Sequence, residues 1–139
     1  MIMRHRKKIF KNSKTSSHTR CMMANMLKSL IENEKIETTL VKAKELKRRI
    51  DKIITLAKKD TLESKRMIKA KLMLNFNYLT NKQKKTKDKT CYNTDRKVFD
   101  KLKEYVIRYK DRKGGYTRTI KAGFRRGDAA PKCFIKFLK

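Results

Sequence analysis

The fold of this chain is decided by residues 36–58, which read IETTLVKAKELKRRIDKIITLAK. In residues 36–40 apolar or β-branched side chains alternate with Glu37 and Thr39, which is the pattern of a short, half-buried strand. After this strand the apolar spacing changes to steps of three and four, so we predict a helix over 41–58. Its buried stripe is predicted to consist of Ala43, Leu46, Ile50, Ile53, Ile54 and Ala57.

A second amphipathic helix is predicted upstream, over residues 17–32. The run Thr15-Ser16-Ser17-His18 supplies side chains that favour helix N-caps. Methionine-rich stripes also occur on adaptable binding surfaces, but leucine and isoleucine continue this stripe, so core packing is favoured. The apolar face consists of Met22, Met23, Met26, Leu27, Leu30 and Ile31.

Two more helices are predicted further along the chain. Asp60 and Glu63 have the spacing of a capping box and open a third helix, which runs to about Leu79. Residues 81–93 are rich in lysine and are predicted to form a flexible loop. A fourth helix follows, with a cap at Asn93 or Thr94 and an inner face of Val98, Phe99, Leu102, Val106 and Tyr109.

The C-terminal part of the chain has the pattern of a β-hairpin. Gly114 and Gly115 end the fourth helix and allow the chain to turn. Apolar and polar side chains then alternate over 116–122 and again over 133–138. Residues 123–131 lie between these two strands and form a long hairpin loop.

The predicted fold class is α+β. About four helices pack on a small three-stranded mixed sheet, which the hairpin forms with the strand at 36–40. Residues 15–139 are long enough for a single domain with one core. Residues 1–14 show no apolar periodicity and are predicted to be a basic, extended N-terminal arm.

Positive charge is the most unusual property of the composition. The chain has 139 residues, of which 41 are Lys or Arg and 13 are Asp or Glu, giving a formal net charge of +28. Such charge also marks disordered chains, but the regular apolar patterns argue against disorder. Residues 1–20 hold seven Lys or Arg and no acid, and residues 113–139 hold eight and one acid. This asymmetry favours a localised phosphate-binding surface.

The sequence contains no motif that indicates an enzyme. There is neither a GxxxxGK[ST] nor a GxGxxG phosphate loop. Ser16, Ser17 and His18 are consecutive at a helix start, where capping explains them better than nucleophilic catalysis. We expect no catalytic residue, metal, cofactor or small-molecule substrate. The chain has three cysteines, Cys21, Cys91 and Cys133. Because they lie far apart in the sequence, they indicate free thiols in a reducing compartment and not a zinc site.

The sequence also gives no sign of a membrane partner. No stretch approaches the roughly 20 apolar residues of a membrane span. The basic start of the chain is not followed by the apolar run of a secretion signal. We therefore expect a cytoplasmic protein, and an organellar location is less favoured.

Nucleic-acid binding is the chemistry that these residues support best. A basic arm can enter crevices of a folded RNA and order as it binds. The start of the first helix can bind a phosphate through hydroxyls and free amides. In the hairpin, an aromatic ring can stack on a base while cations reach phosphates. The candidates are Arg4, His5, Arg6, Lys7, Lys8, Lys11, Lys14, Ser16, Ser17, His18, Arg20, Lys42, Lys44, Tyr116, Arg118, Lys121, Arg125 and Arg126.

Other readings of the same clusters are possible. A basic helix face is usually only solvated, and a lone basic arm also suits DNA, an anionic membrane or a nuclear address. The alternative function is a DNA-compacting or other basic nucleic-acid-binding protein. A DNA binder should show a recognition helix or a dimer seam, and neither is evident. An RNA-modifying enzyme would need a cofactor loop or an acid–base pair.

Several longer blocks, in order along nearly the whole chain, carry a resemblance to a known family. They are Met3-Arg4-His5-Arg6-Lys7, Thr15-Ser16-Ser17-His18, Ile36-Glu37-Thr38-Thr39-Leu40, Lys42-Ala43-Lys44-Glu45-Leu46, Ile54-Thr55-Leu56-Ala57-Lys58, Gly114-Gly115-Tyr116-Thr117-Arg118 and Gly127-Asp128-Ala129-Ala130-Pro131. In these blocks the chain resembles the L17 family of bacterial large-subunit ribosomal proteins. Four departures stand out: Val41 where the family usually has Pro, Ala129 where Asn is usual, a longer loop at 81–93, and Met1-Ile2 before the usual start.

The resemblance implies a one-domain fold of helices on a three-stranded sheet, without catalytic residues or a cofactor. It also implies binding to large-subunit rRNA near the outer opening of the nascent-chain exit tunnel. Neighbouring large-subunit ribosomal proteins are the other implied partners. By position in its blocks, it adds Thr117 and Gly127 to the RNA-binding candidates.

Overall fold

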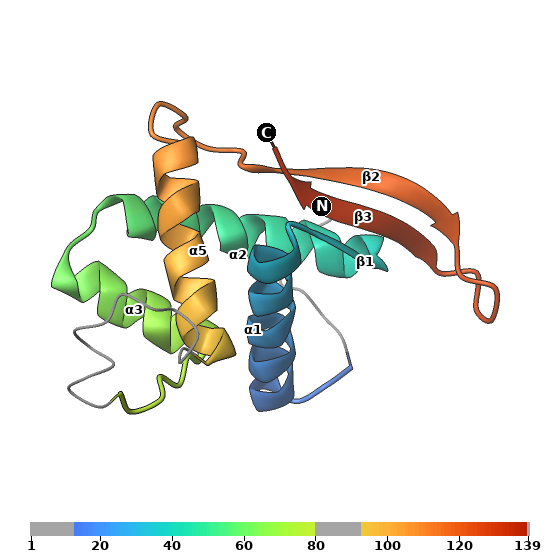
Figure 1. Ribbon diagram of the computed structural model, residues 1–139. Helices are drawn as coiled ribbons and strands as arrows, with labels where there is room; N and C mark the ends of the chain where they lie inside the picture. The colour runs from blue at the N-terminus through green and yellow to red at the C-terminus, as the bar shows by residue number, and fades with distance from the viewer. Residues whose placement is uncertain (1–12, 80–92, 139) are drawn as a thin grey trace, which may run out of the picture.

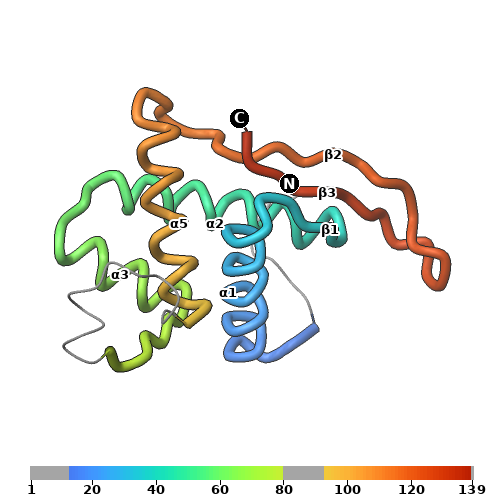
Figure 2. Tube along the Cα trace, in the orientation of Figure 1, coloured from blue at the N-terminus to red at the C-terminus, as the bar shows by residue number. Residues whose placement is uncertain are grey.

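The computed structural model describes residues 13–79 and 93–138, which form four helices and one three-stranded sheet (Figures 1 and 2). The predicted loop at 81–93 lies outside the described residues except for Asn93, and the arm at 1–14 lies outside them except for its last two residues. In chain order the elements are α1 (Ser16–Asn33), β1 (Lys35–Thr39), α2 (Leu40–Lys58), α3 (Leu62–Leu72), α5 (Thr94–Arg108), β2 (Thr117–Phe124) and β3 (Pro131–Phe137).

Helix α2 is the centre of the molecule. It follows β1 without a loop, and Thr39 is its N-cap in an extended conformation. Figure 1 shows α2 running across the molecule, with the hairpin of β2 and β3 extending beyond one end. Helix α2 contacts each of the other six elements. Its buried residues confirm the predicted stripe: Ala43, Leu46, Ile50, Ile53 and Ile54 are buried, and Ala57 is partly buried.

Helix α1 confirms the predicted cap and buries most of the predicted face. The hydroxyl of Thr15 accepts a hydrogen bond from the backbone N–H of His18, at 3.3 Å, which satisfies one free amide of the first turn. At the other end Glu34 adopts a left-handed conformation, with a φ of 61°. This residue reverses the chain into β1, so the helix and the strand meet at a sharp corner.

Helix α3 differs from the prediction at both ends. Its N-cap is Thr61, whose hydroxyl accepts from the N–H of Ser64 at 3.2 Å, so the predicted capping box of Asp60 and Glu63 is wrong. Asp60 lies outside the helix with a φ of 48° and pairs with Lys65 instead. The helix ends at Leu72 because Met73 turns left-handed, with a φ of 52°. Beyond it, Leu74 and Leu79 are buried without being helical, which explains why the apolar pattern continued.

Helix α5 begins where it was predicted. Asn93 is the N-cap, and its side-chain oxygen accepts from the N–H of Arg96 at 3.1 Å. The helix ends at Arg108, earlier than the glycine pair, and residues 109–112 continue as turns. Of the predicted inner face, Val98, Leu102 and Tyr109 are buried, and Phe99 and Val106 are partly buried; Tyr105, which was not predicted, is 1 % exposed.

The sheet has the order β1-β3-β2 and is antiparallel throughout. The prediction of a mixed sheet is therefore wrong. Strands β1 and β2 run in the same direction, and a mixed sheet would have formed only if these two were neighbours. Strand β3 lies between them instead and runs opposite to both.

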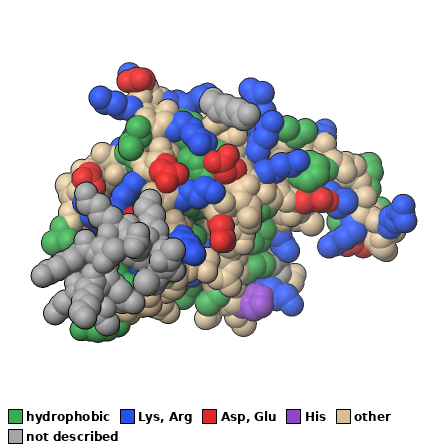
Figure 3. All heavy atoms as spheres, viewed as in Figure 1, with side chains coloured by type: hydrophobic (Ala, Val, Ile, Leu, Met, Phe, Trp, Pro, Cys, Tyr) green, Lys and Arg blue, Asp and Glu red, His purple; other side chains and the backbone are tan. Residues whose placement is uncertain are grey.

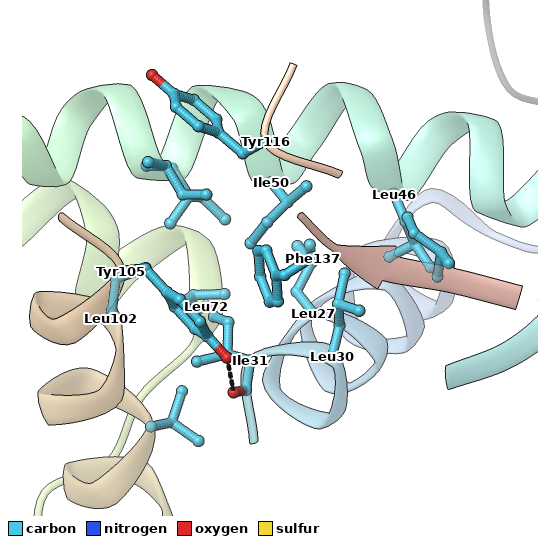
Figure 4. Packing of buried hydrophobic residues seen from close by; sticks show 14 of the residues in the cluster. Leu27, Leu30, Ile31, Leu46, Ile50, Leu72, Leu102, Tyr105, Tyr116 and Phe137 are labelled. Carbon is cyan, nitrogen blue, oxygen red and sulfur yellow. Dashed lines mark hydrogen bonds between the residues drawn. The ribbon is translucent and has the colours of Figure 1, made fainter. Parts of the chain in front are cut away.

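The core lies between the sheet and the four helices. Figure 4 shows Tyr105 of α5, Phe137 of β3 and Ile50 of α2 converging with leucines of α1. The rings of Tyr105 and Phe137 stack with centroids 4.2 Å apart. The phenol of Tyr105 donates to the carbonyl of Ile31 at 2.9 Å, so α5 is tied to the last turn of α1. The hairpin is thus anchored at one end on this core.

Ala129, in the hairpin loop, has an unfavourable backbone conformation for its residue type. Its φ is 51°, a left-handed value that side chains other than glycine and asparagine rarely adopt. We expect Ala129→Asn to raise the free energy of unfolding by about 0.5–1 kcal/mol, because asparagine tolerates this conformation. Urea unfolding measures the change. Ala130→Asn, at a neighbouring residue without a positive φ, is the control, and an equal gain there would contradict the explanation.

Candidate nucleic-acid interface

The outer face of the sheet carries a row of cations. Residues that are directly opposite in antiparallel strands project from the same face. Cys133 and Ile135 of β3 are buried, so their face is the core side. Arg118 of β2 lies opposite Lys136 of β3, which lies opposite Lys35 of β1. These three side chains are exposed and alternate with buried or partly buried residues, so they form one row across the outer face.

An apolar centre lies beside this row. Ile120 of β2 is opposite Phe134 of β3 and is 42 % exposed. The ammonium group of Lys35 sits 4.0 Å above the ring of Phe134, a cation–π contact that holds the cation over the sheet. Glu37 faces the same ring from β1 and pairs with Lys132 at 2.7 Å. The outer face thus combines apolar surface for bases and sugars with cations for phosphates.

The far end of the hairpin exposes an aromatic ring. Between Lys121 and Phe124 the register with β3 shifts by a bulge, in which Gly123 has a φ of +81°. A bulge bends a strand and redirects its side chains. Phe124 is consequently 72 % exposed, directly before two arginines. This ring was missed in the sequence, because alternation alone gives no sign of a bulge.

The loop after Phe124 is held in one shape by hydrogen bonds. The N–H of Arg125 donates to the carbonyl of Ala130 at 2.9 Å, and its guanidinium nitrogens lie 2.8 and 2.5 Å from the two carboxylate oxygens of Asp128. The hydrogen bonds from the guanidinium of Arg125, helped by one from the backbone N–H of Ala130, lower the pKa of Asp128 to about 2. The pair therefore stays charged at neutral pH and fixes the loop that presents Arg126 and Gly127, both exposed.

Two predicted contact residues of the hairpin are buried. Tyr116 is 1 % exposed, its ring packs on Tyr109 at 5.2 Å, and its hydroxyl donates to the carbonyl of Arg112 at 3.1 Å. Thr117 is 2 % exposed. The prediction that Tyr116 stacks on a base is wrong in this structure, because its ring belongs to the core; Phe124 is the exposed ring of the hairpin.

Other predicted cations lie on the same side of the molecule as the hairpin. Arg118 is in the row described above, and Lys121 is exposed opposite Cys133. Lys42 and Lys44 lie in the first turns of α2, next to β1, and none of these four has an ion-pair partner among the described residues. Figure 3 shows Lys and Arg side chains gathered around the far end of the hairpin, whereas acidic side chains are most frequent over the middle of this face.

A second group of predicted residues lies at the start of α1, away from the hairpin (Figure 1). Its members are all exposed, and the first turn of this helix contains no acidic residue. The amide of His18 is already bound to Thr15, so a phosphate here would use the remaining free amides and the hydroxyls. The group consists of Lys14, Ser16, Ser17, His18 and Arg20. The six arm candidates, Arg4, His5, Arg6, Lys7, Lys8 and Lys11, lie outside the described residues.

The structure brings together the hairpin cations and the start of α2, but not the start of α1. The signal for Lys35 and Lys136 was present in the sequence, since both alternate with apolar residues of their strands. To place both lysines in one row, however, the order of the strands must be known, and the sequence did not provide that order. Within the described residues no group of three His, Cys, Asp or Glu side chains is placed to hold a metal ion. Nor does any described helix combine the length and apolar character needed to cross a membrane.

Comparison with known proteins identifies the family of this chain. The model of the family described as ribosomal protein L17 matches residues 22–138. The large ribosomal subunit protein bL17 of Chlamydia trachomatis serovar D is 54 % identical over 140 aligned positions, covering 98 % of this chain and 99 % of the relative. The bL17 proteins of Chlamydia felis and Chlamydia muridarum are 55 % and 54 % identical over the same shares. The chain therefore belongs to the ribosomal protein L17 family.

Proposed function

We propose that this protein is a structural component of the bacterial large ribosomal subunit, and that it acts by binding large-subunit rRNA without catalysing a reaction. The observation that carries the proposal is family membership over nearly the whole chain, at 54 % identity to a large-subunit protein. The net charge of +28 supports it independently. The positive charges of such a globule repel one another, and a bound polyanion such as RNA relieves this repulsion.

The hairpin is the part of the structure that supports RNA contact most directly. Its loop is fixed by the pair of Arg125 and Asp128 before any RNA is bound, so little conformational entropy is lost on binding. Arg118 and Arg126 can reach backbone oxygens, and the exposed ring of Phe124 can stack on an unpaired base. In this proposal the protein screens the repulsion between RNA helices and recognises their shape more than their sequence.

The position within the subunit is part of the same proposal. The resemblance to the L17 family supports a place near the outer opening of the nascent-chain exit tunnel, beside other large-subunit proteins and in the cytoplasm. Co-sedimentation tests the core of the proposal: the protein should remain on large subunits after a wash at moderate salt. Release into the supernatant together with equal affinity for DNA and rRNA would favour a DNA-compacting protein instead.

Phe124 provides a site-directed test of the hairpin. We expect Phe124→Ala to weaken binding to rRNA by about 1–3 kcal/mol, the value of one base stacked on an aromatic side chain. Phe124→Trp should preserve affinity, because an aromatic face remains. The exposed position predicts a change in folding stability within about 0.5 kcal/mol. Filter binding and urea unfolding of both variants measure these effects, and equal affinity of Phe124→Ala and wild type would remove the ring from the interface.

A further inference from the structure

A continuous groove lined by cations runs between α1, α2 and α3. It consists of two adjoining hollows of about 350 and 480 Å³, which share Arg20 and Ala70. The aliphatic side chains of Leu27 and Ile53 form part of its floor, and the small side chain of Ala70 leaves it open. We name it the basic groove; its cations are Arg20, Arg49, Lys52, Arg66, Lys69 and Lys71.

The basic groove has a charge imbalance that the protein does not neutralise. No Asp or Glu is among the described residues that line either hollow. Arg49 is held by the carboxylate of Glu45 at 2.8 Å. Lys52 and Lys71 are exposed, and neither forms an ion pair with an acidic side chain of the described residues. Cations drawn from three helices therefore repel one another in the free protein, and a bound polyanion would relieve this repulsion.

We propose that the basic groove binds the sugar–phosphate backbone of an rRNA segment different from the one at the hairpin. The inference rests on the proposed function. Guanidinium groups at positions 20, 49 and 66 can bind phosphate through paired N–H donors. Membership of a ribosomal protein family favours an RNA backbone as the occupant over an acidic protein segment. The aliphatic floor suits sugars lying between successive phosphates.

The location of the basic groove explains why a second segment is needed. It is lined by the middle of α2 together with α3 and the first half of α1, whereas the hairpin extends beyond the end of α2 that adjoins β1 (Figure 1). One rigid domain that binds two RNA segments holds them at a fixed separation. Binding at one surface then raises the effective concentration of the second segment at the other surface. The protein acts as a clamp in this arrangement.

Charge removal in the basic groove is the first test, made on the full chain. The double variant K52Q/K71Q should bind large-subunit rRNA with a log–log salt slope that is shallower by about 1.4–1.8, since each lost phosphate contact contributes about 0.7–0.9. The matched control is K97Q/K110Q, which removes the same charge from exposed lysines of α5 and its end. Equal slopes for the two double variants would overturn the proposal, because the loss would then reflect net charge alone.

Directed cleavage of rRNA in assembled subunits is the second test. A hydroxyl-radical probe is attached through Ala70→Cys in the basic groove, or through Gly127→Cys in the hairpin loop, where a Cβ meets open space. Both chains carry C21S and C91S, and Cys133 is retained because it is buried. Two separate sets of cleaved nucleotides are expected from the two probes.

The other outcomes separate this inference from the proposed function. Cleavage from position 127 without cleavage from position 70 would overturn the basic groove as an RNA site and leave the proposed function intact. The same nucleotides cleaved from both positions would overturn the second segment. Crosslinking of position 70 to a neighbouring protein would show a protein partner instead. Failure of both variants and of the wild type to enter subunits would contradict the proposed function itself.

Discussion

Removal of residues 1–14 is expected to make binding to large-subunit rRNA weaker and much less dependent on salt, and to prevent stable incorporation into subunits. The deleted segment holds six of the chain's Lys and Arg residues and no acid. Loss of six phosphate contacts lowers the slope of log affinity against log salt by about 4–5. A titration between about 50 and 200 mM salt measures this change.

The truncation separates RNA binding from folding because it leaves the first helix complete. Thr15, the N-cap of α1, is the first residue retained, so the midpoint of urea unfolding should be unchanged. A full-length chain with all six cations replaced by Gln is the control, and it should lose as much affinity as the truncation. Normal incorporation of either variant would show that the arm does not bind RNA.

Truncation of Tyr105 to alanine is expected to destabilise the domain by about 4 kcal/mol, the usual cost of removing a large buried ring. Its ring stacks on Phe137 of β3 and on Tyr109 at the C-terminal end of α5, so it joins the helix to the sheet. For a domain with a stability of about 5–15 kcal/mol, this loss leaves a measurable fraction unfolded. Urea unfolding followed by circular dichroism gives the change.

Tyr105→Phe isolates the hydrogen bond from the packing. The carbonyl of Ile31 is among the last four of α1, which have no partner within the helix, and the phenol of Tyr105 donates to it. The phenol of tyrosine is protonated at neutral pH, and burial raises the pKa of Tyr105 further, so this group is a donor over the whole physiological range. Phenylalanine should cost about 1–3 kcal/mol, because the carbonyl is left unsatisfied. An equal loss for both variants would mean that the ring itself contributes little.

The parts of the fold that could be predicted from sequence are those with local causes. The stripe of α2 and the caps of α1 and α5 depend on residues within a few positions of each other, and the structure confirms them. The end of α3 could not be predicted. Leu74 and Leu79 keep the apolar pattern while the chain leaves the helix at Met73, where tertiary packing outweighs periodicity.

In the candidate interface, too, features with local causes could be predicted from the sequence, whereas features that depend on tertiary packing could not. Arg118 and Arg126 were predicted as contact residues from the hairpin pattern, and both are exposed, but their contact with RNA stays a prediction. Tyr116 was assigned to the wrong side of the molecule, because it precedes β2 and packs on Tyr109 instead of following the alternation of the strand. The basic groove had no local signal, since three separate helices bring its cations together only in the folded chain.

The strand order has a consequence for how the protein is made. Strand β3 is synthesised after β1 and β2, yet it lies between these two strands, which do not pair with each other. A nascent chain that stops before Pro131 can therefore build the helices but cannot assemble the sheet. Folding of the sheet must therefore wait until β3 has left the ribosome, and until then the unfinished polypeptide exposes both apolar side chains and cations to the cell.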